Sequence, residues 1–529
     1  MNKRKGISLI VLVITILVMI ILAGVVIVSL SKNNPVEKAK EATFKGDLTA
    51  FQDELSIYVV NRLALDSNLI ADDINASGYT NVKKLINSFN KKYDGKVEVS
   101  KGRIIYIGKD NKEIEWAKSL GMLEDKESTL LPKPSLAQGM QAVGWEGEKE
   151  VINPSMWYSY ANNLWANAKT PDGSYYVWIP RYAYRIIYYA NKADKNAAYN
   201  MPEGDPKREE KAIGFSDARG IVDKAGNIGV EFIREHNVIE IKFLGEGANK
   251  YSYVENGKYM YDVTKPLGAE NPKGYIVHPA FSPVRRNGFV ATPNGNYGWD
   301  SEINGFWIAK FFMTEHASGE FKSIPGIERT RLLDATETHK AGRSLGAKLF
   351  PSNVKVDTMN MKNTHHGAVV MLSLEAINKK PRHNQSQISG GVLENGGYKR
   401  NVDYSSTQNV TGVYDLVNSD TAWHMLSSAI NNTYFQTNIA TKGLVEHVNT
   451  RYMDMYAFSA EDTRETNYNS NKTKYGDAIY ETTNVNWSSV VNDFPFGEEA
   501  MFSRDHLWVG NIPGDAIRDV WKAIIVINN

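Results

Sequence analysis

The chain has 529 residues, with 61 Lys and Arg, 60 Asp and Glu and no Cys, so its formal net charge is +1. This length exceeds one ordinary domain, and the charge balance excludes a generally basic nucleic-acid binder and a charged disordered chain. Without cysteine there is no disulfide, thiolate nucleophile or thiolate metal site.

The first predicted element is a hydrophobic helix over residues 7–30. No charged residue lies between Lys5 and Lys32, and a helix of this length reaches roughly 36 Å, enough to cross a hydrocarbon core of about 30 Å. Cations precede the run, which places the amino terminus in the cytoplasm and the remainder outside. A buried core helix is rarely apolar on every face. A secretory signal peptide would have a shorter apolar core and a small-residue cleavage site.

An amphipathic helix follows, so the long predicted helix covers 7–62. One face carries an apolar stripe with spacings of four, three, four and three, formed by Phe44, Leu48, Phe51, Leu55 and Tyr58. Residues 63–130 predict a small α/β head. Its elements are a helix at 82–89, strands at 96–99 and 103–107, and a helix at 113–120 capped by Gly121. We expect the stripe and one face of the strand pair to bury each other.

The opening segment KGISLI at 5–10 resembles the prepilin-type signal of type IV pilins and type II secretion pseudopilins. This resemblance implies a leader at 1–6 that a prepilin peptidase removes between Gly6 and Ile7. It also implies N-methylation of Ile7. The hydrophobic helix would then be retained, anchoring the subunit in the membrane before assembly and packing in a filament afterwards.

One position departs from that family. Members usually carry Glu at the fifth mature position, where the carboxylate neutralises a neighbouring amino terminus, and here that position is Val11. The assembly helix, which includes Ile7, Leu9, Val11 and Leu30, therefore lacks this charge pair. Two readings stay open, a non-standard or minor pilin and a membrane-anchored protein that does not polymerise.

Residues 131–150 predict a linker, because prolines cluster at its start; a loop within one domain is the alternative. The large region 151–529 shows short strands, such as 174–179 and 305–311, separated by Gly, Asn and Pro. A helix is expected at 368–378, and the apolar ending at 523–527 predicts a core strand. The predicted fold class of the chain is α+β with much irregular structure.

Six motifs occur in order within this region. They are YVWIPR at 176–181, HPAF at 278–281, GFWIAKF at 305–311, MKNTHHGAV at 361–369, VTGVYDL at 410–416 and GDAIYET at 476–482. Together they resemble the formylglycine-generating-enzyme-like (sulfatase-modifying-factor) group of C-type-lectin-type folds. The resemblance implies a C-type-lectin-like head over 151–529. Residues 418–424 and 503–508 depart from the family pattern, so the head would present a different surface.

We predict no enzymatic activity and no cofactor. The oxidase of that family uses paired cysteines with copper, and this chain has no cysteine. The pair His365–His366 is expected on a strand, where neighbours point to opposite faces and share a metal poorly. The segment at 491–493 weakly resembles the calcium-binding motif of lectins. The patterns of zinc proteases, serine hydrolases, P-loops and EF-hands are absent from the sequence.

Binding is the favoured role of the large head, because aromatic side chains among polar ones suit contact with a sugar or a protein. The candidate binding residues are Trp423, Arg504, Asp505, His506 and Trp508. Core packing is the alternative for each tryptophan, and it is the prediction for Trp178, Trp307 and Trp521.

The expected function is an extracellular, pilin-like filament subunit, minor or at the tip, that presents a large head for adhesion. Its expected partners are a prepilin peptidase, other pilin-like subunits, the membrane and a carbohydrate or protein surface ligand. It would lie in the cytoplasmic membrane before assembly and on the cell surface or pilus afterwards. The alternatives are a non-polymerising, membrane-anchored binding protein and a degenerate enzyme head.

Overall fold

The computed structural model of the chain describes a defined set of residues. These are 35–65, 73–125, 128–146, 149–154, 156–201, 205–217, 220–227, 237–281, 299, 302–317, 320–327, 335–352, 355–377, 383–384, 393–394, 397–398, 402, 405–418, 424–427, 429–431, 452, 454–456, 506–507 and 519–527. The chain divides into two compact units, Met1–Glu124 (unit 1) and Asp125–Asn529 (unit 2). The fold class is α+β, as predicted.

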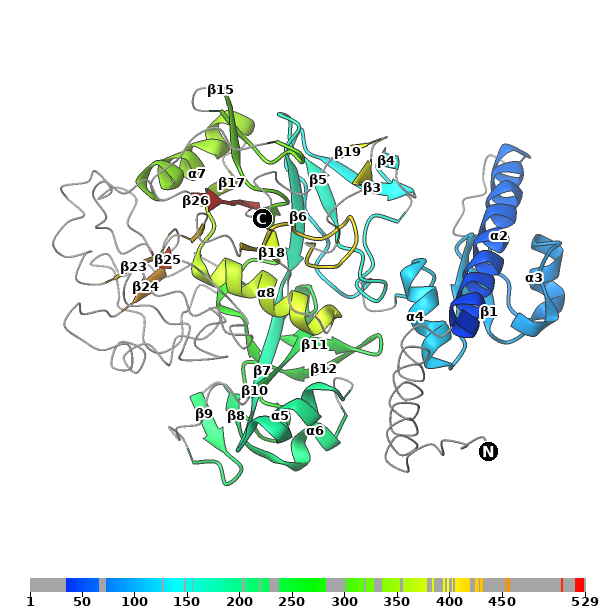
Figure 1. Cartoon of the computed structure of the whole chain (residues 1–529), viewed down its shortest axis with the longest axis horizontal. Helices are drawn as coiled ribbons and strands as arrows, with labels where there is room; N and C mark the ends of the chain where they lie inside the picture. Colours follow the sequence, from blue (N-terminus) through cyan, green and yellow to red (C-terminus); the bar gives the residue numbers. More distant parts are fainter. Residues whose placement is uncertain are drawn as a thin grey trace, which may run out of the picture. The chain divides into compact units, whose positions relative to one another are not determined.

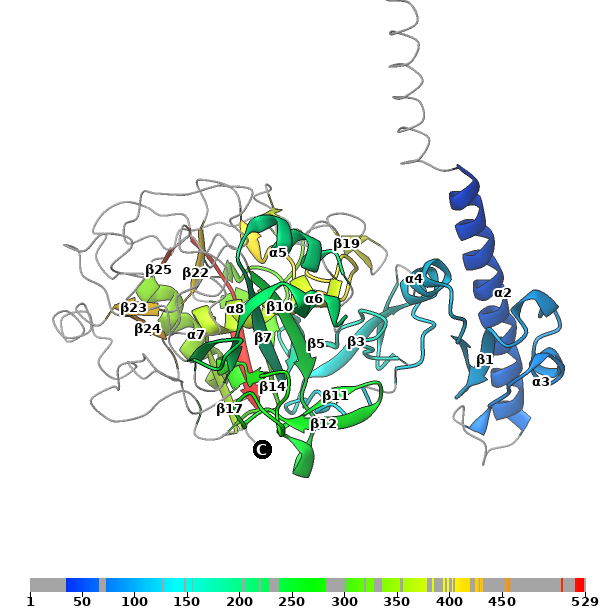
Figure 2. The ribbon, with the colours of Figure 1, turned by 90° about the horizontal axis from the view of Figure 1, so that it is seen from below.

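Unit 1 is built on one long helix (Figures 1 and 2). Its elements in chain order are α2 Pro35–Leu65, α3 Tyr79–Leu85, the 3-10 turn η2 Lys91–Tyr93, β1 Val97–Ser100, β2 Arg103–Tyr106 and α4 Asn111–Ser119. Strands β1 and β2 form an antiparallel pair in which Val97 lies opposite Tyr106. The helices and strands predicted for this region are therefore present, with ends shifted by a few residues.

The core of unit 1 is the predicted stripe of α2 packed against the small module. Phe44, Leu48, Phe51 and Leu55 are buried with Val97, Val99 and Ile104 of the strand pair, and Tyr58 is partly buried beside them. Aromatic rings fill the interface, since Phe44 packs edge-on against Tyr106 at 5.3 Å between centroids. This confirms that the stripe and the strand pair bury each other.

Backbone geometry sets the ends of the short helices in unit 1. Asp110 caps α4 by accepting hydrogen bonds from the amides of Lys112 and Glu113 at 2.9 and 3.0 Å. Gly121 follows the helix with a φ of +69°, as its predicted role at the carboxyl end requires. Gly78 precedes α3 with φ 74° and ψ 151°, a conformation open mainly to glycine.

Unit 2 is organised around a seven-stranded antiparallel sheet (Figure 1). Its spatial order is β17 Val356–Asn360, β27 Ala523–Ile527, β14 Gly305–Ala309, β6 Tyr175–Pro180, β5 Asn167–Lys169, β3 Gln141–Glu146 and β4 Lys149–Ile152. The central strands are apolar throughout because both faces of the sheet are covered.

Alternate residues of the central strands enter two separate cores. Val177, Ile308 and Ile524 enter a core shared with helix α8 Asn363–Ile377. Trp178 and Trp307 enter the other, which includes side chains of helix α7 Ala335–Leu349. Gly342 lets α7 approach β17 closely, since a Cβ there would collide with the Asn360 backbone. Trp178, Trp307 and Trp521 are all buried, which confirms their predicted core positions.

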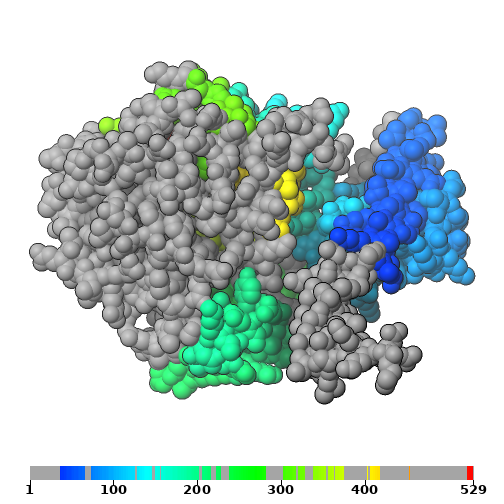
Figure 3. Space-filling view, in the orientation of Figure 1, coloured from blue at the N-terminus to red at the C-terminus, as the bar shows by residue number. Residues whose placement is uncertain are grey.

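A second antiparallel sheet packs into the first of these cores. Its spatial order is β10 Asn237–Phe243, β7 Tyr182–Tyr189, β8 Ala212–Asp217 and β9 Gly220–Asp223, and β13 Ile276–Val277 also pairs with β7. Near this sheet lie the short helices α5 Lys192–Tyr199 and α6 Lys207–Glu210. In the space-filling view the region from α5 to β9 forms a lobe at the lower edge (Figure 3).

The remaining described elements are short. They are the 3-10 turns η3 Gly247–Asn249 and η4 Pro279–Phe281, and the strands β11 Ser252–Glu255, β12 Lys258–Asp262, β15 Thr314–Ala317, β16 Glu320–Lys322, β18 His383–Asn384, β19 Leu393–Glu394, β20 Gly397–Tyr398, β21 Val417–Asn418, β22 His424–Ser427, β23 Ala429–Asn431, β24 Asp454–Tyr456, β25 His506–Leu507 and β26 Asp519–Trp521.

Two expectations for unit 2 need correction. The predicted linker 131–150 contains buried Leu131, Ala137 and Met140 and strand β3, so most of it belongs to the folded body of unit 2. The helix expected at 368–378 begins earlier, at Asn363. The pair His365–His366 consequently lies in the first turn of α8 and not on a strand. The prediction that this pair lies on a strand was therefore wrong.

Candidate functional site

Five of the six sequence motifs meet in one core of unit 2, and the sixth, 476–482, lies outside the described residues. Strand β6 from the first motif pairs with β14 from the third. The ring of Phe281 from the second stacks on Phe306 at 5.5 Å. The imidazole Nε2 of His366 from the fourth lies 3.1 Å from the carbonyl oxygen of Leu416 in the fifth. The motifs therefore mark one shared interior.

At one edge of this interior lies a buried polar group that we call the Lys310 site. It comprises Lys310, Asn167, the backbone of 410–412 and the rings of Trp145 and Tyr414. Lys310 directly follows β14, and its backbone amide donates to the Tyr175 carbonyl at 2.9 Å. Its own carbonyl accepts from the Tyr414 amide at 2.9 Å, which fixes the fifth motif against the sheet.

Two side chains hold three consecutive carbonyls at this site. The Nζ of Lys310 donates to Asn167 Oδ1 at 2.7 Å, to the Gly412 carbonyl at 3.1 Å and to the Val410 carbonyl. The Nδ2 of Asn167 donates to the Thr411 carbonyl at 2.8 Å and to the Trp165 carbonyl at 2.9 Å. The carboxamide is thus held by contacts on both its oxygen and its nitrogen.

Besides its three oxygen partners, the Lys310 side chain is flanked by aromatic rings. Its side chain is fully buried, and Nζ lies 4.9 Å from the centroid of the Trp145 ring and 5.4 Å from that of Tyr414. Burial and the neighbouring Lys522 cation lower the pKa of Lys310 well below its usual value, although Glu150 acts in the opposite direction. A buried amine of this kind is a chemical nucleophile when it loses its proton.

A second buried lysine lies beside the first. The Nζ of Lys522 donates to the carbonyls of Ala309 and Lys310 at 3.4 and 3.3 Å. Burial lowers the pKa of Lys522 to about 7, and the Asp415 carboxylate opposes this shift. Asp415 is itself fully buried and has a φ of +55°, a conformation that is uncommon for residues other than glycine.

The two adjacent histidines are core residues here. The Nδ1 of His365 accepts from the Lys362 amide at 3.2 Å, and its ring packs 4.8 Å from Phe306. Within the described ranges, no group of three or more His, Asp or Glu side chains is arranged to hold a metal ion. The segment 491–493 lies outside those ranges, so its weak resemblance to a calcium motif stays a prediction.

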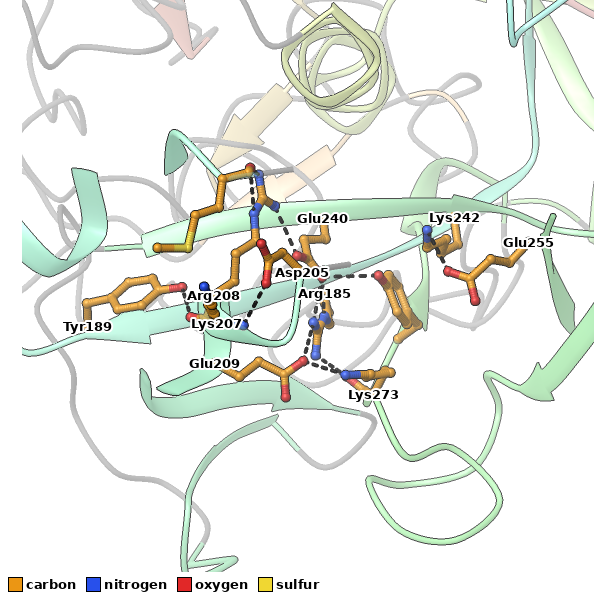
Figure 4. A network of polar contacts seen from close by, with 12 residues as sticks. Arg185, Tyr189, Asp205, Lys207, Arg208, Glu209, Glu240, Lys242, Glu255 and Lys273 are labelled. Atoms are coloured by element: carbon orange, nitrogen blue, oxygen red, sulfur yellow. Dashed lines mark hydrogen bonds and ion pairs between the residues drawn. The ribbon is translucent and has the colours of Figure 1, made fainter. Parts of the chain in front are cut away.

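A network of buried charges joins the strands of the second sheet (Figure 4). Glu240 lies opposite Arg185 in the register of β10 and β7 and accepts from its Nε at 2.6 Å. Arg208 donates to the other carboxylate oxygen at 2.9 Å. Glu209 accepts from Arg185 and from Lys273, at 2.7 and 2.6 Å. This arrangement satisfies both carboxylates and indicates a structural role.

Most of the predicted site residues lie outside the described part of the chain. This applies to Gly6, Ile7, Leu9, Val11 and Leu30 in the amino-terminal segment, and to Trp423, Arg504, Asp505 and Trp508 in the head. His506 is described as part of β25, which pairs in parallel with β22. None of the described helices has the length and hydropathy that a membrane crossing requires.

The sequence reading missed Asn167 and the Arg185–Glu240 pair. A signal for the pair was available, because Arg185 is the single charge within the apolar strand β7 and Glu240 lies between two isoleucines of β10. Lys310 gave a similar signal at the end of an apolar strand, but nothing local pointed to Asn167. No family model matches the chain. No curated protein matches it either.

Proposed function

We propose that the chain is an extracellular, pilin-like filament subunit, minor or at the tip, whose unit 2 serves as a binding head for adhesion. The observation that best supports this proposal is the architecture of unit 1. The long helix α2 begins at Pro35, shortly after the predicted hydrophobic helix 7–30, and buries Phe44, Leu48, Phe51 and Leu55 against a small α/β module. That arrangement suits a subunit with a protruding hydrophobic stem and a compact head.

The proposed maturation begins at the inner face of the membrane. A prepilin peptidase removes residues 1–6, Ile7 becomes the methylated amino terminus, and the helix bearing Leu9, Val11 and Leu30 is retained. The test is co-expression of the full chain with a prepilin peptidase, followed by mass analysis of the amino-terminal peptide. We expect a methylated peptide beginning at Ile7, and no cleavage in Gly6→Val. A wild-type chain that still begins at Met1 after co-expression would contradict this proposal.

The partners in the filament are other pilin-like subunits. We expect the processed protein to co-purify with sheared surface filaments, and an antibody against unit 2 to label them at the tip or at sparse positions. Dense labelling along the whole filament would contradict the minor or tip assignment. A membrane-bound protein without any filament fraction would support the second candidate.

That second candidate is a membrane-anchored binding protein that does not polymerise. Val11 favours it, because the carboxylate that usually pairs with a neighbouring amino terminus is missing at that position. The variant Val11→Glu separates the two ideas. If polymerisation fails only for lack of this charge, the variant gains a filament fraction that the wild-type chain lacks.

For unit 2 we propose a C-type-lectin-type fold related to the formylglycine-generating-enzyme-like group, used for binding and not for catalysis. The meeting of five motifs in one interior supports this proposal. The absence of cysteine removes the residues on which the copper oxidase of that group depends.

The proposed ligand contacts of the head are Trp423, Arg504, Asp505, His506 and Trp508, acting on a carbohydrate or protein surface. The test is binding of the full chain in detergent to a glycan array and to host-cell surface extracts. We expect Trp508→Ala to lose at least tenfold in affinity. Tyr261→Ala is the control, since this half-exposed aromatic lies on the separate hairpin strand β12. Equal losses in both variants would overturn the assignment of Trp508.

A further inference from the structure

The Lys310 site places an amine directly against a carboxamide in a closed interior. Both Lys310 and Asn167 are fully buried, and their Nζ and Oδ1 atoms lie 2.7 Å apart. An amine without solvent access cannot act on an external substrate. The electrophile that it contacts is the carbonyl group of Asn167 itself, a residue 143 positions earlier in the chain.

We propose that Lys310 and Asn167 become joined by an intramolecular amide bond between Nζ and Cγ, with release of ammonia. The product is a covalent tie from β5 to the end of β14, across the intervening strand β6. This inference concerns the chemistry of unit 2 and does not depend on the proposed adhesive function.

The reaction balances without any oxidant, reductant or co-reactant. The neutral amine of Lys310 attacks Cγ of Asn167 and forms the new N–C bond, while the carbonyl π electrons move onto Oδ1. One proton then passes from Nζ to Nδ2. Collapse of the intermediate restores the carbonyl, breaks the Cγ–Nδ2 bond and releases ammonia, so one amide replaces another.

The site fits both stages of this reaction. While Lys310 is charged, the Val410 and Gly412 carbonyls and Asn167 Oδ1 hold Nζ in position. Burial among the Trp145 and Tyr414 rings and the nearby Lys522 cation favour loss of the proton, and the pKa of Lys310 is lowered accordingly. Reactants fixed in contact avoid the entropy cost of a bimolecular encounter.

The geometry also orients the leaving group. The Nδ2 of Asn167 donates to the Trp165 and Thr411 carbonyls, so the amide plane is fixed and its carbonyl faces Lys310. The contact with Thr411 also holds the fifth motif over the reacting atoms. A cross-link at this point would keep β5 and the end of β14 together even when the surrounding hydrogen bonds open.

Mass spectrometry of the full chain tests the proposal directly. We expect the intact mass to fall short of the sequence mass by one ammonia. After trypsin digestion, we expect peptides 150–169 and 287–322 to appear as one branched species, uncut at Lys310. Recovery of the separate, unmodified peptides 150–169 and 287–310 as the dominant products would overturn the proposal.

Matched variants identify the bond. Asn167→Asp should react with loss of water, so its branched product has the same mass as the wild-type product although the unreacted chains differ. Lys310→Arg keeps a cation but cannot form the bond, and we expect the full sequence mass. Lys169→Arg is the control, because this lysine lies on the same strand as Asn167 and its replacement should leave the cross-link intact. Loss of the branched species in Lys169→Arg would mean that the bond depends on Lys169 and not on Lys310 alone, and it would overturn the proposal.

Discussion

The two units of this chain solve the problem of burial in different ways. Among the described residues of unit 1, every residue that is fully buried is apolar or aromatic. The ion pairs of unit 1, such as Lys45–Glu41 and Lys92–Asp47, lie at the surface. The described interior of unit 2 contains charged side chains, including Arg185, Glu240, Lys310 and Lys522. The first design depends on apolar packing, whereas the second also depends on long-range polar partners.

This difference has an energetic consequence. An apolar core loses stability in proportion to the volume that is removed. A buried charge can cost much more when its partner is deleted, because the remaining ion stays desolvated. Unit 2 should therefore be more sensitive than unit 1 to single polar substitutions, and unit 1 more sensitive to substitutions within its stripe.

The largest expected effect follows from Glu240→Ala. This variant leaves Arg185 and Arg208 buried without the carboxylate that both contact. We expect the free energy of unfolding of unit 2 to fall by about 3–5 kcal/mol. Hydrogen exchange of the β7 and β10 amides, followed against urea, measures it. The control is Glu41→Ala, which removes a half-exposed pair with Lys45 in unit 1 and should cost less than about 0.5 kcal/mol. Similar costs for both variants would contradict the contrast between the units.

The same network predicts how unit 2 responds to acid. Burial raises the pKa of Glu240, but Arg185 and Arg208 outweigh it and hold the pKa below its usual 4.5. The native carboxylate therefore takes up a proton less readily than the unfolded one. Its contribution is complete above the unfolded pKa and is lost as the pH falls through the lower native value. We expect the unfolding free energy of unit 2 to decline in acid, and Glu240→Gln to flatten this decline. If the unfolding free energy of the variant declined with falling pH as steeply as that of the wild-type chain, other groups would be responsible for the decline.

The next effect concerns the apolar stripe of unit 1. Leu48 is fully buried on α2, so Leu48→Ala should lower the unfolding free energy of unit 1 by about 2–5 kcal/mol. Ile57→Ala on the same helix removes a side chain that is 64% exposed, and it should change the value by less than about 0.5 kcal/mol. Hydrogen exchange of the β1 and β2 amides reports on both variants. A large effect of Ile57→Ala in a monomeric sample would mean that this side chain is covered.

The contrast also explains what could be predicted from the sequence. The stripe of Phe44, Leu48, Phe51 and Leu55 is local, so helical spacing was enough to predict the core of unit 1. The pairing of Lys310 with Asn167 joins residues 143 positions apart, and no local pattern encodes it. The helix carrying His365 was predicted to begin too late, because its first residues, 363–367, precede the apolar run on which the prediction rested.

The smallest effects separate backbone strain from packing, using two glycines of unit 1. An added Cβ would meet no atom within 4 Å at either Gly78 or Gly46. Gly78 has φ 74° and ψ 151°, so Gly78→Ala should lower the unfolding free energy by about 1–3 kcal/mol through strain alone. Gly46 lies within α2, where Gly46→Ala should raise it by about 0.5–1 kcal/mol through helix propensity. Opposite signs at two equally open sites would show that local backbone preference contributes to unit 1 independently of its core. Equal signs would mean that one of these segments has a different backbone conformation in solution.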